Sequence, residues 1–359
     1  MRRKVLLITP RFPFPPVSGG EKWISELSKG LAQEHELSLF TFMARGAETH
    51  QAALAMSMEG RLFKKVFLLK RPEPEAIAIN RRYMPVLAAG FWSTEAGEEV
   101  ARAAAEAGAE IAHINFSEMA CYVNALPAGL PSIYTEHDSS YLYPWKYYLR
   151  ETAGLKGFLK IGEYVKVRAY ARRYYGRFSG VTFLTASDGR DIKRYVKTAS
   201  TAVTPNAVRH TEFAAPSGTV RNPGEILFIG HYPHFPNEDA ALRLARGIVP
   251  RLKARYPAAR LTLAGSYPTP TVRALAGPET EIPGTVPDIR PFLWRAEIFA
   301  APVRYGFGAK GKILEAFAAG LPVVASREAA AGIEGAEAGK HLLAASGEAD
   351  FARLALRLL

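Results

Sequence analysis

Short apolar runs alternate with amphipathic stretches along the first part of the chain. Residues 5–8 and 37–42 are apolar almost throughout, as strands buried on both faces are. Between them, residues 21–33 carry apolar side chains at helical spacing. This alternation predicts a parallel sheet with helices on both faces. Further strands are predicted at 65–69, 111–114, 132–135, 181–184 and 201–204, a helix at 95–107, and one or two helices in 141–178.

The same pattern restarts after a turn signal, Pro205-Asn206, and a stretch rich in Pro, Gly and Ser at 216–224. We therefore predict two Rossmann-like, doubly wound α/β domains, residues 1–204 and 205–359, that face a central cleft. Ligands of such sheets bind beyond the carboxyl ends of the strands. In the second domain we expect strands at 226–229, 261–264, 298–300 and 322–325, helices at 239–254 and 312–319, and a loop or frayed helix at 329–338.

Composition narrows the class of protein. The 359 residues suit two domains, and a 48% apolar fraction suffices for two cores. One cysteine, Cys121, provides neither an internal disulfide nor a cysteine metal cluster. The apolar run near the N-terminus is too short for a signal peptide, and no run approaches the ~18 apolar residues of a membrane span. We expect a cytoplasmic protein, at most peripheral to the inner face of the cell membrane.

The net charge of +12 is concentrated in one region. Residues 140–200 hold thirteen Lys and Arg against four Asp and Glu, whereas residues 1–139 hold fifteen against sixteen. A basic, aromatic region of this kind suits an anionic membrane surface or a phosphorylated substrate. The alternative is a long surface helix whose aromatic side chains lie in the core. No nucleic-acid-binding motif accompanies the charge, so we expect no nucleic-acid partner.

The loop at 10–20 joins the first predicted strand to the first predicted helix. Gly19 and Gly20 would present backbone N–H groups at a helix N-terminus, where an anion such as phosphate binds well. The alternative is a simple turn in which Ser18 caps the helix. The loop is not a G-x-G-x-x-G sequence, which disfavours a dinucleotide-binding enzyme.

A second candidate is the sequence T-E-H-D at 135–138, directly after a predicted strand. His137 would lie at the carboxyl end of that strand, where it can bond sugar hydroxyls or a phosphate. The alternative is a histidine whose bonds are all local to the turn.

The third candidate is the segment 302–326. Gly306 and Gly308 allow close approach of a ligand to the backbone, and Lys310 and Lys312 lie where a helix begins. Glu315 is three residues beyond Lys312 and shares its helix face. Cations for a diphosphate beside a carboxylate for ribose hydroxyls are what a nucleotide-sugar site requires. The alternative, an amphipathic helix with an ion pair, leaves the glycines unexplained.

Together these segments resemble the retaining glycosyltransferases of the GT-B fold, family GT4, over nearly the whole chain. The most specific part is 315–324, which is similar to the family signature E-A-x-A-x-G-x-P-V-V. Weaker similarities are the loop 10–20, T-E-H-D at 135–138, T-P-N-A-V at 204–208, F-I-G-H at 228–231 and I-P-G-T-V-P-D at 282–288.

The resemblance implies roles for individual residues. His137, Lys312 and Glu315 would form the catalytic set, with His137 orienting the donor sugar and Glu315 the ribose. The implied donor-binding residues are Gly19, Gly20, His231, Val286, Gly308, Lys310, Lys312 and Glu315.

The sequence departs from the family pattern in three places. Phe307 stands where many members carry a second Glu that contacts the donor sugar, and the loop 231–237 lacks the usual Arg and Lys. We expect Lys310 and Lys312 to supply the missing cationic charge. The family usually continues well beyond Leu359 with a helix that crosses back onto the first domain, so we expect a truncated crossover.

The implied reaction moves a hexose from a nucleoside diphosphate to a hydroxyl of a glycan or lipid-linked acceptor, with retention, in polysaccharide or glycoconjugate synthesis. The sequence contains no Asp-x-Asp pair, so we expect no metal and no other cofactor. Two alternatives remain open: a nucleotide-sugar epimerase of the same fold, and a relative that binds nucleotide-sugars without catalysis.

Overall fold

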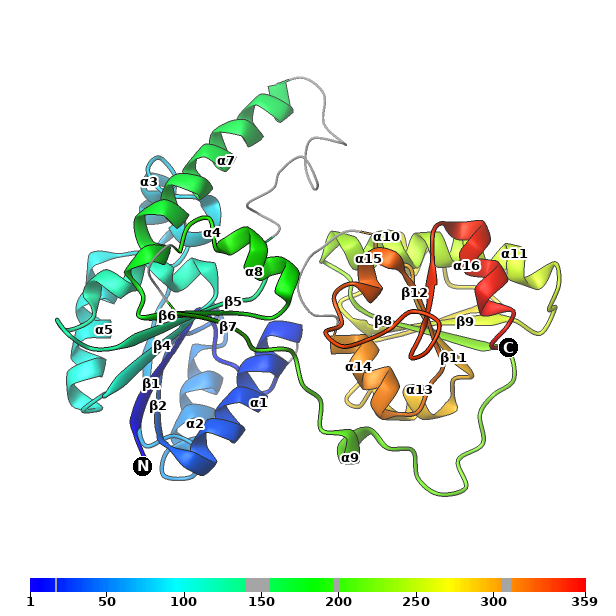
Figure 1. The fold of residues 1–359 in the computed structure, drawn as a ribbon, viewed down its shortest axis with the longest axis horizontal. Helices are drawn as coiled ribbons and strands as arrows, with labels where there is room; N and C mark the ends of the chain where they lie inside the picture. The colour runs from blue at the N-terminus through cyan, green and yellow to red at the C-terminus, as the bar shows by residue number, and fades with distance from the viewer. Residues whose placement is uncertain (17, 140–154, 197–199, 305–310) are drawn as a thin grey trace. The chain divides into compact units, whose positions relative to one another are not determined.

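The computed structural model describes residues 1–16, 18–139, 155–196, 200–304 and 311–359. The chain divides into two compact units, Met1–Pro205 and Asn206–Leu359, each built around one parallel sheet (Figure 1). None of the helices in these ranges is long and apolar enough to cross a membrane.

The first unit contains a seven-stranded sheet in the order β3-β2-β1-β4-β5-β6-β7, with every neighbouring pair parallel. The order reverses direction between β1 and β4, so loops leaving these two strands diverge to opposite faces and open a crevice for ligands. Its strands are β1 Lys4–Thr9, β2 Glu36–Phe42, β3 Val66–Leu69, β4 Ile111–Asn115, β5 Ser132–Glu136, β6 Gly180–Phe183 and β7 Ser200–Val203.

Helices cover both faces of this sheet (Figure 1). Alternate residues of β1 point to opposite faces, and both sets are buried: Leu6 and Ile8 on one side, Val5 and Leu7 on the other. Leu6 and Ile8 share a core with residues of α4, α5, η1 and α7, while α1 and α2 lie on the other face. The helices are α1 Gly19–Glu34, α2 Glu48–Met58, α3 Pro74–Asn80, α4 Val86–Ala89, α5 Thr94–Glu106, η1 Ser117–Ala125, α7 Leu155–Tyr174, η3 Tyr175–Arg177 and α8 Ala186–Ile192.

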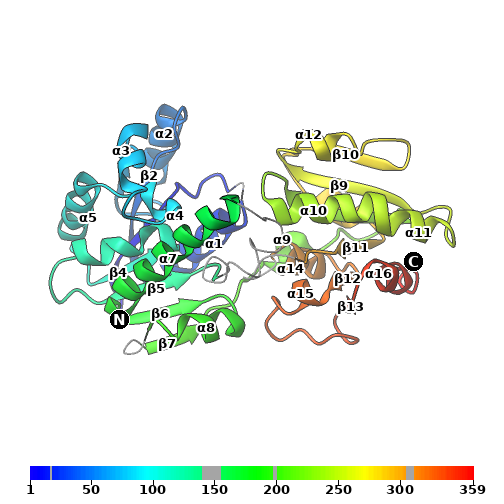
Figure 2. The ribbon, with the colours of Figure 1, turned by 90° about the horizontal axis from the view of Figure 1, so that it is seen from above.

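The second unit repeats the plan with six parallel strands in the order β10-β9-β8-β11-β12-β13, and its order reverses between β8 and β11. Figure 2 shows this sheet from above, with α10 and α11 running along it. The strands are β8 Glu225–His231, β9 Arg260–Ser266, β10 Thr280–Gly284, β11 Ile298–Ala301, β12 Val323–Ser326 and β13 Leu343–Ala345. The helices are α9 His210–Phe213, α10 Phe235–Arg243, η4 Leu244–Ile248, α11 Val249–Lys253, α12 Pro270–Arg273, α13 Arg290–Arg295, α14 Gly311–Ala318, α15 Arg327–Ala330 and α16 Glu348–Ala355.

The helix expected at 239–254 forms, but with a wide π turn in its middle, η4. Pro250 lies two residues after that turn, at the second position of α11, and has no N–H to donate to the preceding turn of an α-helix. The local widening therefore coincides with the point where the ladder of α-helical hydrogen bonds is interrupted.

Both strand orders are those of doubly wound sheets. The predicted fold class, α/β with two Rossmann-like doubly wound domains, is confirmed.

Candidate functional site

In the first unit, the loop after β1 ends in a capped helix. Ser18 Oγ accepts a hydrogen bond from the Glu21 N–H at 3.3 Å, and the Glu21 carboxylate accepts one from the Ser18 N–H at 3.0 Å. This reciprocal pair is a capping box. The cap considered as an alternative is therefore present, and it fixes Gly19 and Gly20 as the first residues of α1 at the reversal point of the sheet.

The two glycines have different surroundings. A Cβ atom added at Gly20 would lie 2.9 Å from the Phe116 ring, whereas nothing lies within 4 Å of one added at Gly19. Phe116 follows β4 directly and has a φ of 69°, a left-handed conformation that is rare for an aromatic residue. Gly20 is thus a close-packing position, and Gly19 is the open one.

The Phe116 ring also packs against His137. The two rings are stacked at 3.7 Å between centroids and 14° between planes, and Trp23 of α1 meets the imidazole edge-on at 4.6 Å. The His137 Nε2 lies 3.5 Å from Asn115 Oδ1. Burial lowers the pKa of His137 to about 3, with a smaller contribution from His113. At neutral pH the ring is therefore uncharged, and it can serve as a hydrogen-bonding group but not as a cation.

The neighbouring Glu136 anchors the loop that carries His137. Its buried carboxylate accepts hydrogen bonds from the Tyr134 hydroxyl at 2.6 Å and the Tyr175 hydroxyl at 3.0 Å. It also accepts from the backbone N–H groups of His137, at 3.0 Å, and Asp138, at 3.3 Å. In the sequence T-E-H-D, the glutamate therefore fixes the backbone of the turn, and this turn carries the histidine.

A second histidine lies beneath this corner. His113 of β4 is buried, and its Nε2 is 2.7 Å from Thr135 Oγ1, which is itself 2.7 Å from Thr182 Oγ1. Burial lowers the pKa of His113 to about 4. The two contacts link β4, β5 and β6 through side chains close to the end of β5, which His137 follows directly.

In the second unit, β8 and β9 approach each other closely at their carboxyl ends. Gly230 and Gly265 are paired across the two strands, and a Cβ at Gly265 would lie 1.9 Å from the Gly230 carbonyl oxygen. One residue further on, His231 Nδ1 is 2.8 Å from Ser266 Oγ. The glycine pair therefore sets the spacing that lets His231 bond across the strands.

Lys312 is joined to His231 through one residue. The Lys312 ammonium donates to Asn237 Oδ1 at 2.6 Å and lies 4.5 Å from the centroid of the Phe228 ring. The Asn237 amide in turn donates to the His231 carbonyl at 2.8 Å. These contacts bring the N-terminal turn of α14 to the end of β8, at the reversal point of the second sheet. One turn further along α14, the Glu315 side chain is buried.

The segment that carries Val286 reaches the same end of the sheet. Tyr267, at the end of β9, has a φ of 51° and its ring meets the His231 ring edge-on at 5.8 Å. The Tyr267 N–H donates to Thr285 Oγ1 at 3.1 Å, which holds the loop with the partly buried Val286 next to β9.

An ion pair fixes the end of β11, where the segment 302–326 begins. The Arg304 guanidinium binds the buried Asp239 carboxylate of α10 with two hydrogen bonds, at 2.6 and 3.0 Å. Arg243 donates to the Pro302 carbonyl at 2.6 Å. Both contacts tie this end of the strand to α10.

The structure thus brings together two sets of predicted residues, each within one unit. Gly20 and His137 meet through Phe116 in the first unit, with the open Gly19 beside them. His231, Lys312 and the Val286 loop are linked in the second, and Glu315 lies on the same helix as Lys312. Phe307, Gly308 and Lys310 lie outside the described residues.

Several contact residues were not predicted. They are Asn115, the last residue of β4, and Phe116 and Tyr267, which directly follow β4 and β9. Of these, only Asn115 could have been suggested by the sequence, because it is a polar residue at the end of an apolar strand. Asn237 was expected in a loop and lies instead in the first turn of α10, and no sequence spacing connects it to Lys312, which is 75 residues away.

Comparison with known proteins matches both units to families of glycosyltransferases. Residues 17–212 match the family described as Glycosyltransferase Family 4, and residues 223–359 match the family described as Glycosyl transferases group 1. No curated protein sequence matches the chain.

Solved structures share the fold over the whole chain. Sucrose-phosphate synthase from Thermosynechococcus elongatus has 14% identity and a TM-score of 0.67, with 99% of this chain and 90% of that one covered. HepE from Anabaena, solved with UDP and glucose, has 14% identity and a TM-score of 0.63, with 99% and 89% covered. A TarM mutant from S. aureus, solved with fondaparinux, α-GlcNAc-glycerol and UDP, has 10% identity and a TM-score of 0.64, with 99% and 92% covered.

Proposed function

The chain belongs to glycosyltransferase family 4 and has the GT-B fold, and on that premise we propose that it transfers a hexose from a nucleoside diphosphate to an acceptor hydroxyl with retention. The acceptor in this proposal is a glycan or a lipid-linked sugar of polysaccharide or glycoconjugate synthesis. HepE with UDP and glucose, and TarM with UDP and a GlcNAc-glycerol, are relatives in fold with ligands of these classes, which supports the proposal.

One observation carries it: the contact of Lys312 with Asn237, and of Asn237 with the His231 carbonyl, at the reversal point of the second sheet. A cation at a helix start beside this crevice suits the diphosphate of a donor. In the reaction, negative charge grows on the leaving diphosphate. We assign its stabilisation to Lys312, to the N-terminus of α14 and to Lys310 and Gly308 of the preceding segment.

The other site residues take orienting roles in this proposal. Glu315 binds the ribose hydroxyls, His231 and Val286 bind the nucleotide side, and Gly19 and Gly20 offer N–H groups to phosphate. His137 orients the donor sugar. An uncharged imidazole is suited to this because it donates and accepts hydrogen bonds without the energetic cost of a buried charge.

We propose that the leaving phosphate itself accepts the acceptor's proton during attack on the same face of the sugar. The new glycosidic bond forms from the acceptor oxygen to the anomeric carbon, and the bond to the diphosphate oxygen breaks. We also propose that no metal takes part: the sequence has no Asp-x-Asp pair, and the residues described contain no cluster of three metal-ligating side chains.

The test is a thermal-shift panel of UDP-, GDP-, ADP- and TDP-sugars, since a ligand that binds the native state raises its melting temperature. We expect one nucleotide class to stabilise the protein equally with EDTA and with Mg²⁺. Lys312→Ala and Glu315→Gln should abolish most of that shift. Lys340→Ala and Glu337→Gln are matched controls, because that exposed pair has the same three-residue spacing in the same unit.

A parent-like shift in Lys312→Ala and Glu315→Gln would show that the donor binds elsewhere. A shift that requires Mg²⁺ would contradict the metal-independent mechanism. Release of an epimerised donor without any acceptor would overturn transfer in favour of epimerisation.

The proposal extends to location: a cytoplasmic protein that is peripheral at the inner face of the membrane, through the basic region 140–200. Its described part includes the cationic side chains of Lys166 and Arg173 on α7. Salt-sensitive flotation with anionic vesicles tests this location, and no flotation at low salt would exclude it.

A further inference from the structure

Tyr267, the residue after β9, combines a rare backbone conformation with an exposed ring. Its φ of 51° is left-handed, which is uncommon for an aromatic residue. Pro268 comes next, and a residue before a proline ordinarily has an extended backbone. The side chain is 57% exposed, so packing in a core does not account for a large ring at this position. The stability of the fold therefore gives no reason for a tyrosine here.

Contacts on both sides of Tyr267 hold this conformation in place. The Tyr267 N–H donates to Thr285 Oγ1 at 3.1 Å, which ties the residue to the loop after β10. On the other side, the Pro268 carbonyl accepts a hydrogen bond from Arg273 Nε at 3.1 Å. Strained backbone that its surroundings enforce in this way is concentrated at sites that bind ligands.

The Tyr267 ring forms a corner with a residue of the candidate site. It meets the His231 ring edge-on, with 5.8 Å between the centroids and 84° between the planes. A planar ligand that stacks on one of these rings would therefore meet the other at about a right angle. A nucleobase is planar, and bases of every kind stack on aromatic side chains.

Exposed aromatic side chains in the second unit are confined to this end of the sheet. In its described part, the large hydrophobic residues that are exposed are Val220, Phe235 and Tyr267. Val220 lies in the segment before β8, whereas Phe235 begins α10 just after β8 and Tyr267 follows β9. Both rings are thus near the carboxyl ends of strands, where doubly wound sheets bind their ligands.

The order of the strands places Tyr267 on the far side of β8 from Lys312. The strands β11, β8, β9 and β10 are neighbours in that order and all parallel, so their carboxyl ends follow one another along one edge. Two strand spacings, roughly 10 Å, separate the ends of β11 and β9. A nucleotide with its diphosphate at Lys312 would extend its ribose across the end of β8 and bring its base to Tyr267.

We propose that the Tyr267 ring stacks on the nucleobase of the donor, and that its left-handed backbone is retained for this contact. The inference rests on the proposed function, since it takes Lys312 as the site of the diphosphate. Every base has a π face, so the stack adds affinity for any nucleoside diphosphate, and other contacts choose among the bases.

The test compares two ligands of the full chain by isothermal titration calorimetry. One is whichever of UDP, GDP, ADP and TDP binds the parent most tightly, and the other is pyrophosphate, which has no base. Tyr267→Asn removes the ring and substitutes a residue that tolerates positive φ. It should weaken the nucleotide at least about tenfold, as loss of a base stack does, and leave pyrophosphate unchanged. Lys312→Ala should weaken both ligands.

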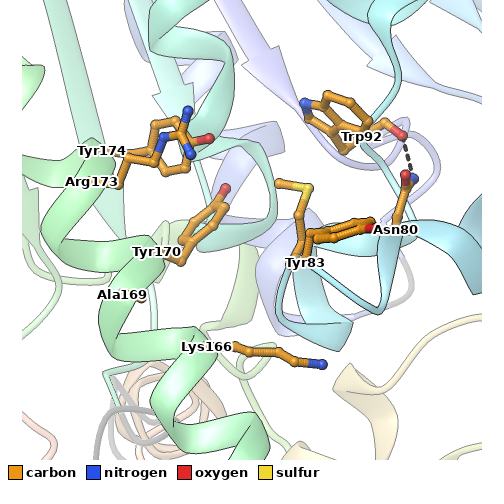
Figure 3. Close-up of a pocket in the computed structure, with 9 residues that line it drawn as sticks. Asn80, Tyr83, Trp92, Lys166, Ala169, Tyr170, Arg173 and Tyr174 are labelled. Carbon is orange, nitrogen blue, oxygen red and sulfur yellow. Dashed lines mark hydrogen bonds between the residues drawn. The ribbon is translucent and has the colours of Figure 1, made fainter.

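Tyr83→Asn is the matched control. Tyr83 is also a highly exposed tyrosine, and it lines a pocket of the first unit between α7 and the segment after α3 (Figure 3). The same substitution there should leave both affinities unchanged. Tyr267→Phe keeps the ring and should bind the nucleotide as the parent does.

Tyr267→Gly separates binding from stability. Glycine adopts a φ of 51° without steric cost, so the ligand-free protein should melt at the same temperature or higher. The variant should nevertheless lose nucleotide affinity as Tyr267→Asn does. A tyrosine with a purely structural role would not give that combination, and a lower melting temperature would overturn the assignment of the strain to binding.

Unchanged nucleotide affinity in Tyr267→Asn, or equal losses for nucleotide and pyrophosphate, would overturn the stack while leaving the proposed function intact. A loss seen only with the nucleotide-sugar, and not with the nucleotide, would assign the ring to the sugar and also overturn it. Failure of the proposed function is distinguishable: none of the four nucleotides would bind the parent, or Lys312→Ala would bind both ligands normally, and either result would overturn both.

Discussion

At the scale of single residues, the corner formed by Gly20, Phe116 and His137 depends on close ring packing. Phe116 adopts a left-handed backbone conformation, and its ring occupies the space that a side chain at position 20 would need. Such strain persists where the surroundings stabilise it, here by the stack on His137.

Gly20→Ala should therefore lower the free energy of unfolding of the first unit by about 1–3 kcal/mol, the usual cost of overpacking. Gly19→Ala, one residue earlier in the same helix, has open space and should be neutral or stabilise by about 0.5–1 kcal/mol. Urea unfolding followed by Trp fluorescence measures both. Equal effects of the two substitutions would mean that the Phe116 ring is not fixed in place.

His113 gives the stability of the first unit a pH dependence. Its folded pKa is about 4, below the ordinary value of 6.5, so the unfolded state binds more protons between these values. The stability it contributes is fully present above pH 6.5 and is lost as the pH falls towards 4, at up to about 1.4 kcal/mol per pH unit. His113→Gln should flatten that slope.

His50→Gln, at an exposed histidine, is the control for that substitution. A slope that is unchanged in His113→Gln would show that other groups cause the acid sensitivity. His137, whose pKa is also lowered by burial, should account for part of the remaining slope.

At the scale of elements, the carboxyl ends of β8 and β9 form the part of the second unit that we propose binds the nucleotide. Gly265 has a φ of 132° and faces the Gly230 carbonyl. A residue with a side chain would place its Cβ on that carbonyl, and it would rarely adopt this φ. The bond between His231 and Ser266 follows directly.

We expect Gly265→Ala to destabilise the second unit by about 3 kcal/mol and to reduce the donor-induced thermal shift, because β8 and β9 must separate. Gly277→Ala, an exposed site with open space on the following loop, should do neither. Differential scanning calorimetry with and without donor separates the two effects. Normal donor binding in Gly265→Ala would show that the strand spacing is irrelevant to the site.

The elements that the sequence predicted are those with clear apolar patterns. The strands 5–8 and 226–229 and the helix 312–319 were found to within three residues at each end. The missed elements lack that pattern. In α2 only Ala55 is buried, and β10 is an edge strand that contains Pro283 and Gly284, residues that disfavour strands.

The site was predictable to the extent that its residues lie at strand ends or in the family signature. His137 and Lys312 were proposed as site residues in this way, but the residues that contact them in the structure were not predicted. Phe116 and Trp23 reach His137 from different elements, and that proximity depends on tertiary packing that no local spacing encodes.

At the scale of the whole molecule, the two hydrophobic cores are separate. Each of the two clusters of buried residues in the described chain draws on one unit: one from Leu6 to Val196, the other from Ile226 to Ala355. Each sheet also has its own set of covering helices.

Because the cores are separate, we expect two thermal transitions in the intact protein, with the donor raising the one that belongs to the second unit more than the other. Gly20→Ala and Gly265→Ala assign the transitions, since each should lower one of them. A single transition that both variants lower would mean that the units unfold together and would contradict the expectation.

The contact between Gly20 and Phe116 also restricts how the sequence can vary over evolutionary time. The two positions are far apart in the chain but share one space, so their sizes are coupled. A larger residue at 20 requires a smaller one at 116, and that smaller residue gives up the stack on His137. Enlarging residue 20 alone causes a clash with the Phe116 ring, and shrinking residue 116 alone removes the ring that stacks on His137. The two residues should therefore be conserved together or replaced together.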